Sequence, residues 1–165
     1  CQEGLAKGYF CKKADGTPFV AAVWPGKAYF ADFLRPEVRE WFGGRYKVLT
    51  DLGIEGFWND MNEPSLFYSP ERLRAFLNDM AALREKDNIE QEEFFPRVVG
   101  GAMGLMNSPA DYASFYHEVD GQKVRHDQVH NLYGGSMTSL AVTATAASGW
   151  ATTIPAGPSC WPISK

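Results

Sequence analysis

A strand, a helix and a second strand follow one another in the first 60 residues, and this pattern constrains the fold most. Residues 19–24 form a short apolar run after a glycine-containing turn, which predicts a buried strand. Residues 36–52 repeat apolar side chains at three- and four-residue spacing between a proline and a glycine, which predicts a helix. Residues 54–58 predict a second strand. Such a βαβ unit has parallel strands and a right-handed crossover, so we expect an α/β fold.

The ends of the two predicted strands carry the side chains of greatest chemical interest. Trp24 ends the first strand, and Asp60 follows the second. In barrels built from βαβ units, the functional residues gather at the C-terminal ends of the strands. Trp24 and Asp60 are therefore predicted to lie on the same side of the sheet.

The rest of the chain divides into three stretches of different character. Residues 70–88 have the apolar spacing of an amphipathic helix, which we interpret as an insertion after the second strand. Residues 94–127 are rich in glycine and proline and predict a hairpin or loops. Residues 135–165 contain no charged side chain except Lys165, a break from everything upstream.

Charge and cysteine content exclude several classes of protein. The net charge is −4, with acidic and basic side chains mixed, which argues against a nucleic-acid or anionic-membrane surface. The odd set Cys1, Cys11 and Cys160 lacks the spacing of a zinc ribbon or a disulfide scaffold and indicates a reducing compartment. No stretch has the length of a membrane helix, and the N-terminal residues lack a signal-peptide layout. A cytoplasmic location is expected; the oligomeric state is not predicted.

The run GFWNDMNEP at residues 56–64 places two carboxylates, amides and an aromatic side chain at the end of an apolar strand. One interpretation is a helix cap made by Asp60 and Glu63. A second is a divalent-metal site, which the absence of a nearby histidine disfavours. A third is glycoside hydrolysis, in which one carboxylate attacks the anomeric carbon and another carboxyl group protonates the leaving oxygen.

The same run closely resembles the nucleophile signature of glycoside hydrolase family 31, W-x-D-M-N-E. Upstream, VWPG at residues 23–26, FADF at 30–33 and EWF at 40–42 are similar to the V-W-P-G, F-P-D-F and W-W stretch of that family. HNLYG at 130–134 resembles the H-N-x-Y-G that opens the next barrel helix. The chain departs from the pattern at Ala31 and Phe42, and neither change touches the nucleophile.

The resemblance implies a fold and a reaction. The fold would be part of a (β/α)8 TIM barrel, about strands 3–4, with an insertion after the nucleophile strand. The reaction would be the release of terminal α-linked glucose from an oligosaccharide or disaccharide, through a covalent glycosyl-Asp60 intermediate, without a cofactor or metal. The residue sequence around Asp60 is closer to that of the α-glucosidases of the family than to that of its α-xylosidases.

The resemblance also implies roles for the neighbours of Asp60. Trp24, Trp58 and Met61 would contact the sugar, while Asn62 and Glu63 would support the nucleophile loop. His117, His126 and His130 receive no catalytic role and are expected to make packing or capping hydrogen bonds.

One part of the catalytic set is missing. A retaining mechanism needs an acid/base carboxyl group about 5–5.5 Å from the nucleophile, and no G-D-N-like motif of the family follows Gly134. We therefore divide the chain into a partial catalytic barrel at 1–134 and a divergent tail at 135–165. The tail is interpreted as a shifted reading frame, a misassembled gene, an artificial end or a genuine divergence. The isolated chain is expected to be inactive; the alternatives are an inactive remnant and a non-catalytic carbohydrate-binding module.

Overall fold

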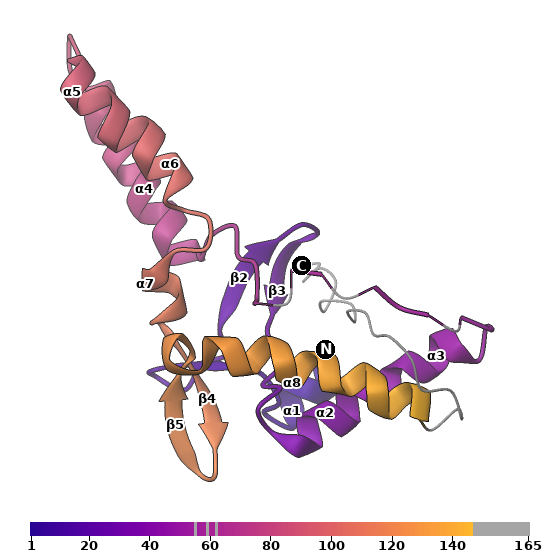
Figure 1. Ribbon diagram of the computed structural model, residues 1–165. Helices are drawn as coiled ribbons and strands as arrows, with labels where there is room; N and C mark the ends of the chain where they lie inside the picture. The colour runs from indigo at the N-terminus through magenta and orange to yellow at the C-terminus, as the bar shows by residue number, and fades with distance from the viewer. Residues whose placement is uncertain (55, 59, 62, 147–165) are drawn as a thin grey trace.

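The computed structural model describes residues 1–146 except 55, 59 and 62, with side chains described as far as residue 138. A small body carries a two-helix arm that projects away from it (Figure 1). In chain order the elements are α1 (Gln2–Ala6), β1 (Lys12–Lys13), β2 (Val20–Val23), β3 (Gly26–Tyr29), α2 (Pro36–Gly43), η1 (Gly44–Tyr46), α3 (Lys47–Thr50), α4 (Pro70–Arg84), α5 (Gln91–Phe94), η2 (Phe95–Gly100), α6 (Gly101–Met103), α7 (Pro109–Tyr112), β4 (Phe115–Val119), β5 (Gln122–Arg125) and α8 (His126–Ala146).

The strands of the described residues form two small antiparallel sheets. One sheet has the order β1-β4-β5, and the other is the hairpin of β2 and β3. In the hairpin Val23 pairs with Gly26, so that Trp24 and Pro25 make a two-residue turn. Gly26 has a φ of 108°, a left-handed conformation that glycine adopts without steric cost.

The helix predicted at 36–52 is present, but it is divided into three pieces. The α2 helix ends at Gly43, η1 is a single 3₁₀ turn, and α3 completes the segment. Two adjacent glycines weaken the α-helix at this point because each is a poor helix former. Gly53, with a φ of 85°, follows the last turn as predicted.

The predicted parallel βαβ unit is not present among the described residues. The first strand forms as β2, but it pairs antiparallel with β3, and Ala22 bridges Tyr68 antiparallel. The described part of 54–58 has no strand assignment. A parallel barrel strand requires hydrogen-bonding strands beside it, and β2 takes its neighbours from the hairpin and from the chain after Asp60.

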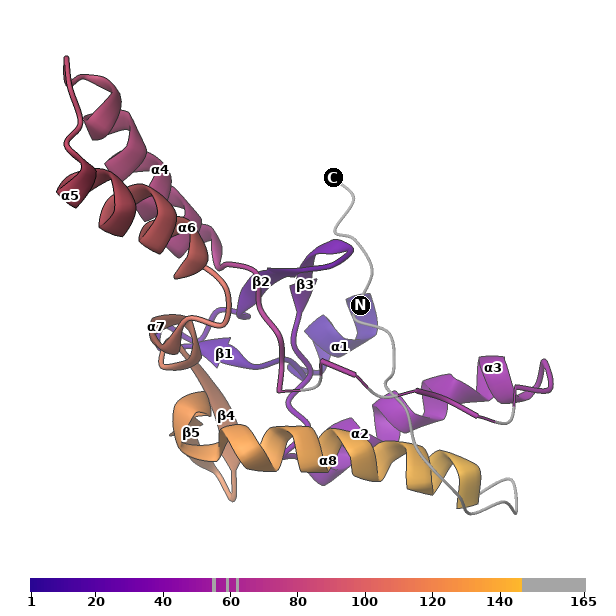
Figure 2. The same ribbon diagram turned by 45° about the horizontal axis from the view of Figure 1, so that its top comes forward.

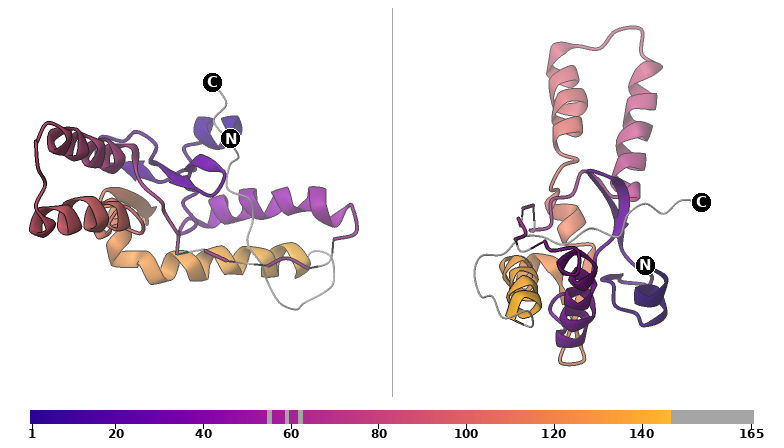
Figure 3. Two further views of the ribbon diagram at one scale, coloured as in Figure 1. Left: turned by 90° about the horizontal axis from the view of Figure 1, so that it is seen from above. Right: turned by 90° about the vertical axis from the view of Figure 1, so that its right-hand side faces the viewer.

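The helix predicted at 70–88 forms as α4, which is one half of the projecting arm. The α4 helix lies against the segment formed by α5, η2 and α6, and Figure 3 shows the two halves extending together from the body. Ser69 caps α4 by accepting a hydrogen bond from the Arg72 amide. Between the halves, Arg97 pairs with Asp79 of α4, and within its own half it pairs with Glu93. The hairpin expected within 94–127 forms as β4 and β5, whereas much of the remainder is helical.

An aromatic core joins the sheets to the long helix α8, which lies alongside α2 (Figures 1 and 2). The Phe115 ring stacks on Phe19 at a centroid distance of 4.2 Å and on His126 at 4.4 Å. Tyr133 is buried against Phe33 from the next turns of α8. The α8 helix continues through residue 134, so the predicted boundary at 134/135 falls inside it.

None of the helices in the described part of the chain is both long and apolar enough to cross a membrane.

Replacing Phe115 by alanine should lower the free energy of unfolding by about 3–5 kcal/mol, because it removes the central ring of the core. Urea denaturation followed by circular dichroism measures the change. Phe95→Ala is the control, since Phe95 is 53% exposed on the arm and its loss should cost less than about 1 kcal/mol. Equal losses for the two variants would contradict this account of the core.

Candidate functional site

The loop around Asp60 leaves the carboxylate exposed to solvent. One carboxylate oxygen, Oδ1, accepts a hydrogen bond from the Met61 amide at 2.9 Å. Met61 has a φ of 55°, an uncommon conformation for a residue with a side chain. Ahead of Asp60, the half-buried Phe57 ring packs edge-on against Tyr46 at 4.8 Å, which places this end of the loop against the body.

Trp24 reaches this loop from the turn of the hairpin. Its indole Nε1–H donates to Met61 Sδ at 2.9 Å, and its ring meets Phe67 edge-on at 4.9 Å. Two backbone hydrogen bonds of 2.8 Å hold the segments together, from the Ala22 amide to Tyr68 and from the Phe67 amide to Ala22. The structure therefore brings Trp24 beside Met61, the residue after Asp60, through a hairpin rather than through parallel strand ends.

The other predicted site residues are placed less closely. Trp58 is 83% exposed and Trp24 is 73% exposed, so both rings present aromatic surface to solvent. Glu63 is half-buried. Asn62, predicted to support the loop, lies outside the described residues, as does Asn59.

The chain that follows Asp60 is held by two side chains that sequence analysis did not single out. Asn107 Oδ1 accepts the Leu66 amide hydrogen bond at 2.8 Å. The Tyr112 hydroxyl lies 3.0 Å from the Pro64 carbonyl and 3.0 Å from Asn107 Oδ1. Burial, with the nearby Glu63 charge, raises the pKa of Tyr112 to about 12, so its hydroxyl remains a donor at neutral pH. Nothing in the local sequence signals the bonds to Pro64 and Leu66, which join residues more than 40 positions apart.

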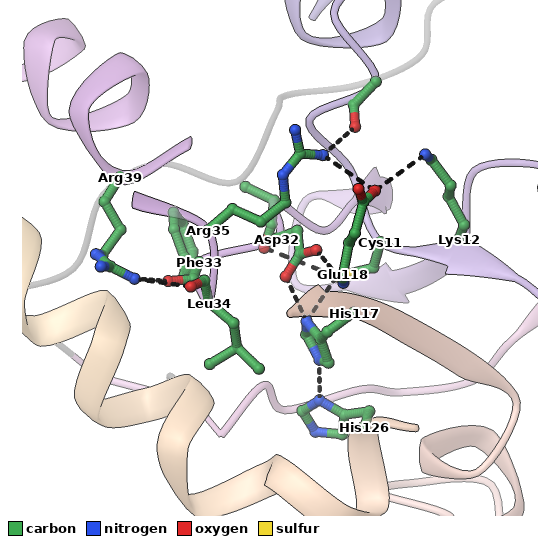
Figure 4. A network of polar contacts seen from close by, with 12 residues as sticks. Cys11, Lys12, Asp32, Phe33, Leu34, Arg35, Arg39, His117, Glu118 and His126 are labelled. Carbon is green, nitrogen blue, oxygen red and sulfur yellow. Dashed lines mark hydrogen bonds and ion pairs between the residues drawn. The ribbon is translucent and has the colours of Figure 1, made fainter. Parts of the chain in front are cut away.

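Three histidines and an aspartate form a hydrogen-bonded chain that runs from the buried Asp32 to the half-buried His130. Asp32 Oδ1 lies 2.7 Å from His117 Nδ1, His117 Nε2 lies 2.9 Å from His126 Nδ1, and the same distance separates His126 from His130. Burial and the neighbouring His117 and His130 lower the pKa of His126 to about 3, so its ring is neutral at neutral pH. The histidines thus make the internal hydrogen bonds expected of them. Figure 4 shows the part of this chain from Asp32 to His126.

The sequence matches the TIM-barrel domain of glycosyl hydrolases family 31 over residues 1–153. This range includes the Asp60 loop and the hairpin of Trp24, and it leaves out only the last 12 of the 165 residues. The chain belongs to glycoside hydrolase family 31. The family fold is a (β/α)8 barrel, of which this chain supplies one part.

Alpha-glucosidases are among the relatives. Alpha-glucosidase 2 of Bacillus thermoamyloliquefaciens is 36% identical over 122 residues, which cover 74% of this chain and 14% of that protein. Alpha-xylosidase 1 of Arabidopsis thaliana is 48% identical over 69 residues, covering 41% of this chain and 7% of that protein. The chain therefore spans about one-seventh or less of the length of these two relatives.

A solved structure supports the fold. The family 31 dextranase of Flavobacterium johnsoniae, complexed with glucose, aligns with a TM-score of 0.57 at 20% identity, covering 93% of this chain and 14% of that one. At this level of identity the likeness concerns the fold alone. It agrees with the family assignment made from the sequence.

Asn107→Ala should destabilise the chain by about 1–2 kcal/mol, because it leaves the Leu66 amide without its side-chain acceptor. Asn107→Asp keeps an acceptor oxygen at the same place and should change stability by less than about 0.5 kcal/mol. Chemical denaturation of both variants gives the comparison. A loss of the same size in Asn107→Asp would show that the hydrogen bond is not the cause.

Proposed function

We propose that this chain is part of a retaining α-glucosidase-type glycoside hydrolase in which Asp60 is the nucleophile. The observation that carries the proposal is the exposed Asp60 carboxylate next to Met61, whose sulfur accepts the Trp24 indole hydrogen bond. An exposed carboxylate in a loop with exposed tryptophan side chains suits attack on a sugar, because sugar rings stack on aromatic faces and the anomeric carbon is electrophilic.

In this mechanism an Asp60 oxygen forms a bond to the anomeric carbon as the bond to the leaving oxygen breaks. A separate carboxylic acid gives its proton to that oxygen and then accepts a proton from water, whose oxygen displaces Asp60 and releases glucose. Trp24, Trp58 and Met61 contact the sugar, and Asn62 and Glu63 support the loop. The substrate is an α-linked glucose at the end of an oligosaccharide or disaccharide.

The position of the chain in the barrel follows from the same proposal. Residues 1–134 correspond to about strands 3–4 of the complete domain, and the arm of α4, α5, η2 and α6 is the insertion after the nucleophile strand. Residues 135–165 form the divergent tail. In a complete domain, neighbouring strands would pair with residues 54–58, whose described members, 54 and 56–58, have no strand assignment.

The isolated chain should not hydrolyse p-nitrophenyl α-glucoside above the rate in buffer. The physical reason is that no acid/base motif of the family accompanies Asp60, so the leaving oxygen would depart without a proton. Release of p-nitrophenol is measured by absorbance. If the isolated chain hydrolysed the substrate and Asp60→Ala abolished this activity, the proposal that the chain lacks its acid/base group would be wrong.

A chimera tests the role of Asp60 directly. Residues 8–134 of this chain would replace the aligned segment of the Bacillus alpha-glucosidase, to which the chain is 36% identical. We expect the chimera to hydrolyse p-nitrophenyl α-glucoside and Asp60→Ala to reduce hydrolysis to the background rate. Asp51→Ala is the matched control, because Asp51 is an exposed carboxylate paired with Lys47 and should leave the rate unchanged. Full activity in Asp60→Ala would exclude Asp60 as the nucleophile.

A non-catalytic carbohydrate-binding module is the second candidate, and the exposure of Trp24 and Trp58 favours it. Calorimetry of the isolated chain with maltose distinguishes the candidates. A binding module would give saturable heat that Trp24→Ala removes, whereas an inactive remnant would give none.

A further inference from the structure

Cys11, Asp32 and His117 form a compact buried cluster within the core. One potential ligand atom of each residue lies within 4.8 Å of the others, and the side chains are 1–2% exposed. Cys11 Sγ is 3.6 Å from His117 Nδ1, which is 2.7 Å from Asp32 Oδ1. The three residues come from separate parts of the chain and converge on one point (Figure 4).

Asp32 and His117 have hydrogen bonds of ordinary length, whereas Cys11 has only long ones. Asp32 accepts from the Glu118 amide at 2.7 Å and lies at hydrogen-bond distance from His117. Cys11 Sγ has only long contacts, 3.8 Å to the Ala31 carbonyl and 3.6 Å to His117 Nδ1. A single proton on Nδ1 can be donated to Asp32 or to Cys11, not to both.

We propose that Cys11, Asp32 and His117 bind a zinc ion. Thiolate, imidazole and carboxylate are the donors that zinc takes in proteins, and the two anionic ligands cancel its charge within the core. Tetrahedral zinc with bonds of 2.0–2.3 Å places its ligand atoms about 3.3–3.7 Å apart. The separation of Cys11 and His117 has this value already, and Asp32 must move from His117 by less than about 1 Å. The third pair, Cys11 and Asp32, has ligand atoms within 4.8 Å of each other, so these two side chains would adjust as the ion binds.

Neighbouring groups hold the proposed ligands in place by hydrogen bonds, as is usual at zinc sites. With zinc on Nδ1, His117 keeps its proton on Nε2 and donates it to His126 Nδ1, 2.9 Å away. His126 continues the chain to His130. The free oxygen of Asp32 remains fixed by the Glu118 amide.

A cavity of about 260 Å³ is lined in part by Asp32 and His117, and a water entering from this side would be the fourth ligand of the zinc. Lys12, Arg35 and Lys123 line this cavity, and two of them, Lys12 and Arg35, face Glu118 at 3.9 and 3.8 Å. The Glu118 carboxylate thereby offsets part of the positive charge that an entering zinc ion would meet in this cavity. Zinc here would join residues 11, 32 and 117, and so would stabilise the fold rather than act on a sugar at Asp60.

Cobalt(II) is the probe for this site, because its bond to a thiolate gives a near-ultraviolet charge-transfer band. Cys1→Ser with Cys160→Ser leaves Cys11 as the single cysteine of the chain. We expect this variant to take up one equivalent of cobalt with the band, and zinc to displace the cobalt. Zinc should also raise the midpoint of thermal unfolding as its concentration rises.

Cys11→Val in the same background is the matched variant, since it removes the sulfur while retaining an apolar side chain in the core. The band should be lost while near-ultraviolet circular dichroism remains. His126→Phe keeps a ring against Phe115 and should weaken zinc binding about 10–100-fold. Absence of the band at saturating cobalt, or its persistence in Cys11→Val, would overturn the proposal. These measurements do not involve Asp60, so they stand or fall independently of the proposed glycosidase function.

Discussion

The stack of Phe19, Phe115 and His126 is the interaction on which the rest of the described structure depends. These rings come from the segment before β2, from β4 and from the start of α8, and all three are nearly inaccessible to solvent. Aromatic rings bury large areas with defined geometry, so one stack fixes the relative position of both small sheets and the long helix. Short strands of two to five residues would not hold such an arrangement by backbone hydrogen bonds alone.

The Asp60 loop lies at the edge of this core and takes its position from it. Tyr112 and Asn107 precede β4 and hold the chain after Asp60, while Trp24 reaches Met61 from the hairpin. A few hydrogen bonds between residues distant in sequence thus attach the Asp60 loop to the core. Loops placed in this way by a packed scaffold are where enzymes commonly carry reactive groups.

Asp32 and Asp60 differ in solvent exposure and therefore in what their carboxylates can bind. Asp32 is buried, accepts the Glu118 amide and faces a histidine, so each of its oxygens already has a partner. Asp60 is exposed, with a local bond to the following amide. A buried carboxylate without partners would be costly, which is why Asp32 belongs to the internal network. The exposed carboxylate remains accessible to a ligand.

The sequence alone determined the family, through local motifs whose residues lie close together along the chain. It also predicted β2, the helix from Pro36 and the helix α4, because apolar spacing and turn residues act locally. Only the tertiary structure decided which distant residues contact one another. The antiparallel partners of β2, the Asn107 and Tyr112 supports and the cluster of Cys11, Asp32 and His117 join residues distant in sequence. No local spacing encodes such contacts, since they arise when the core brings separate segments together.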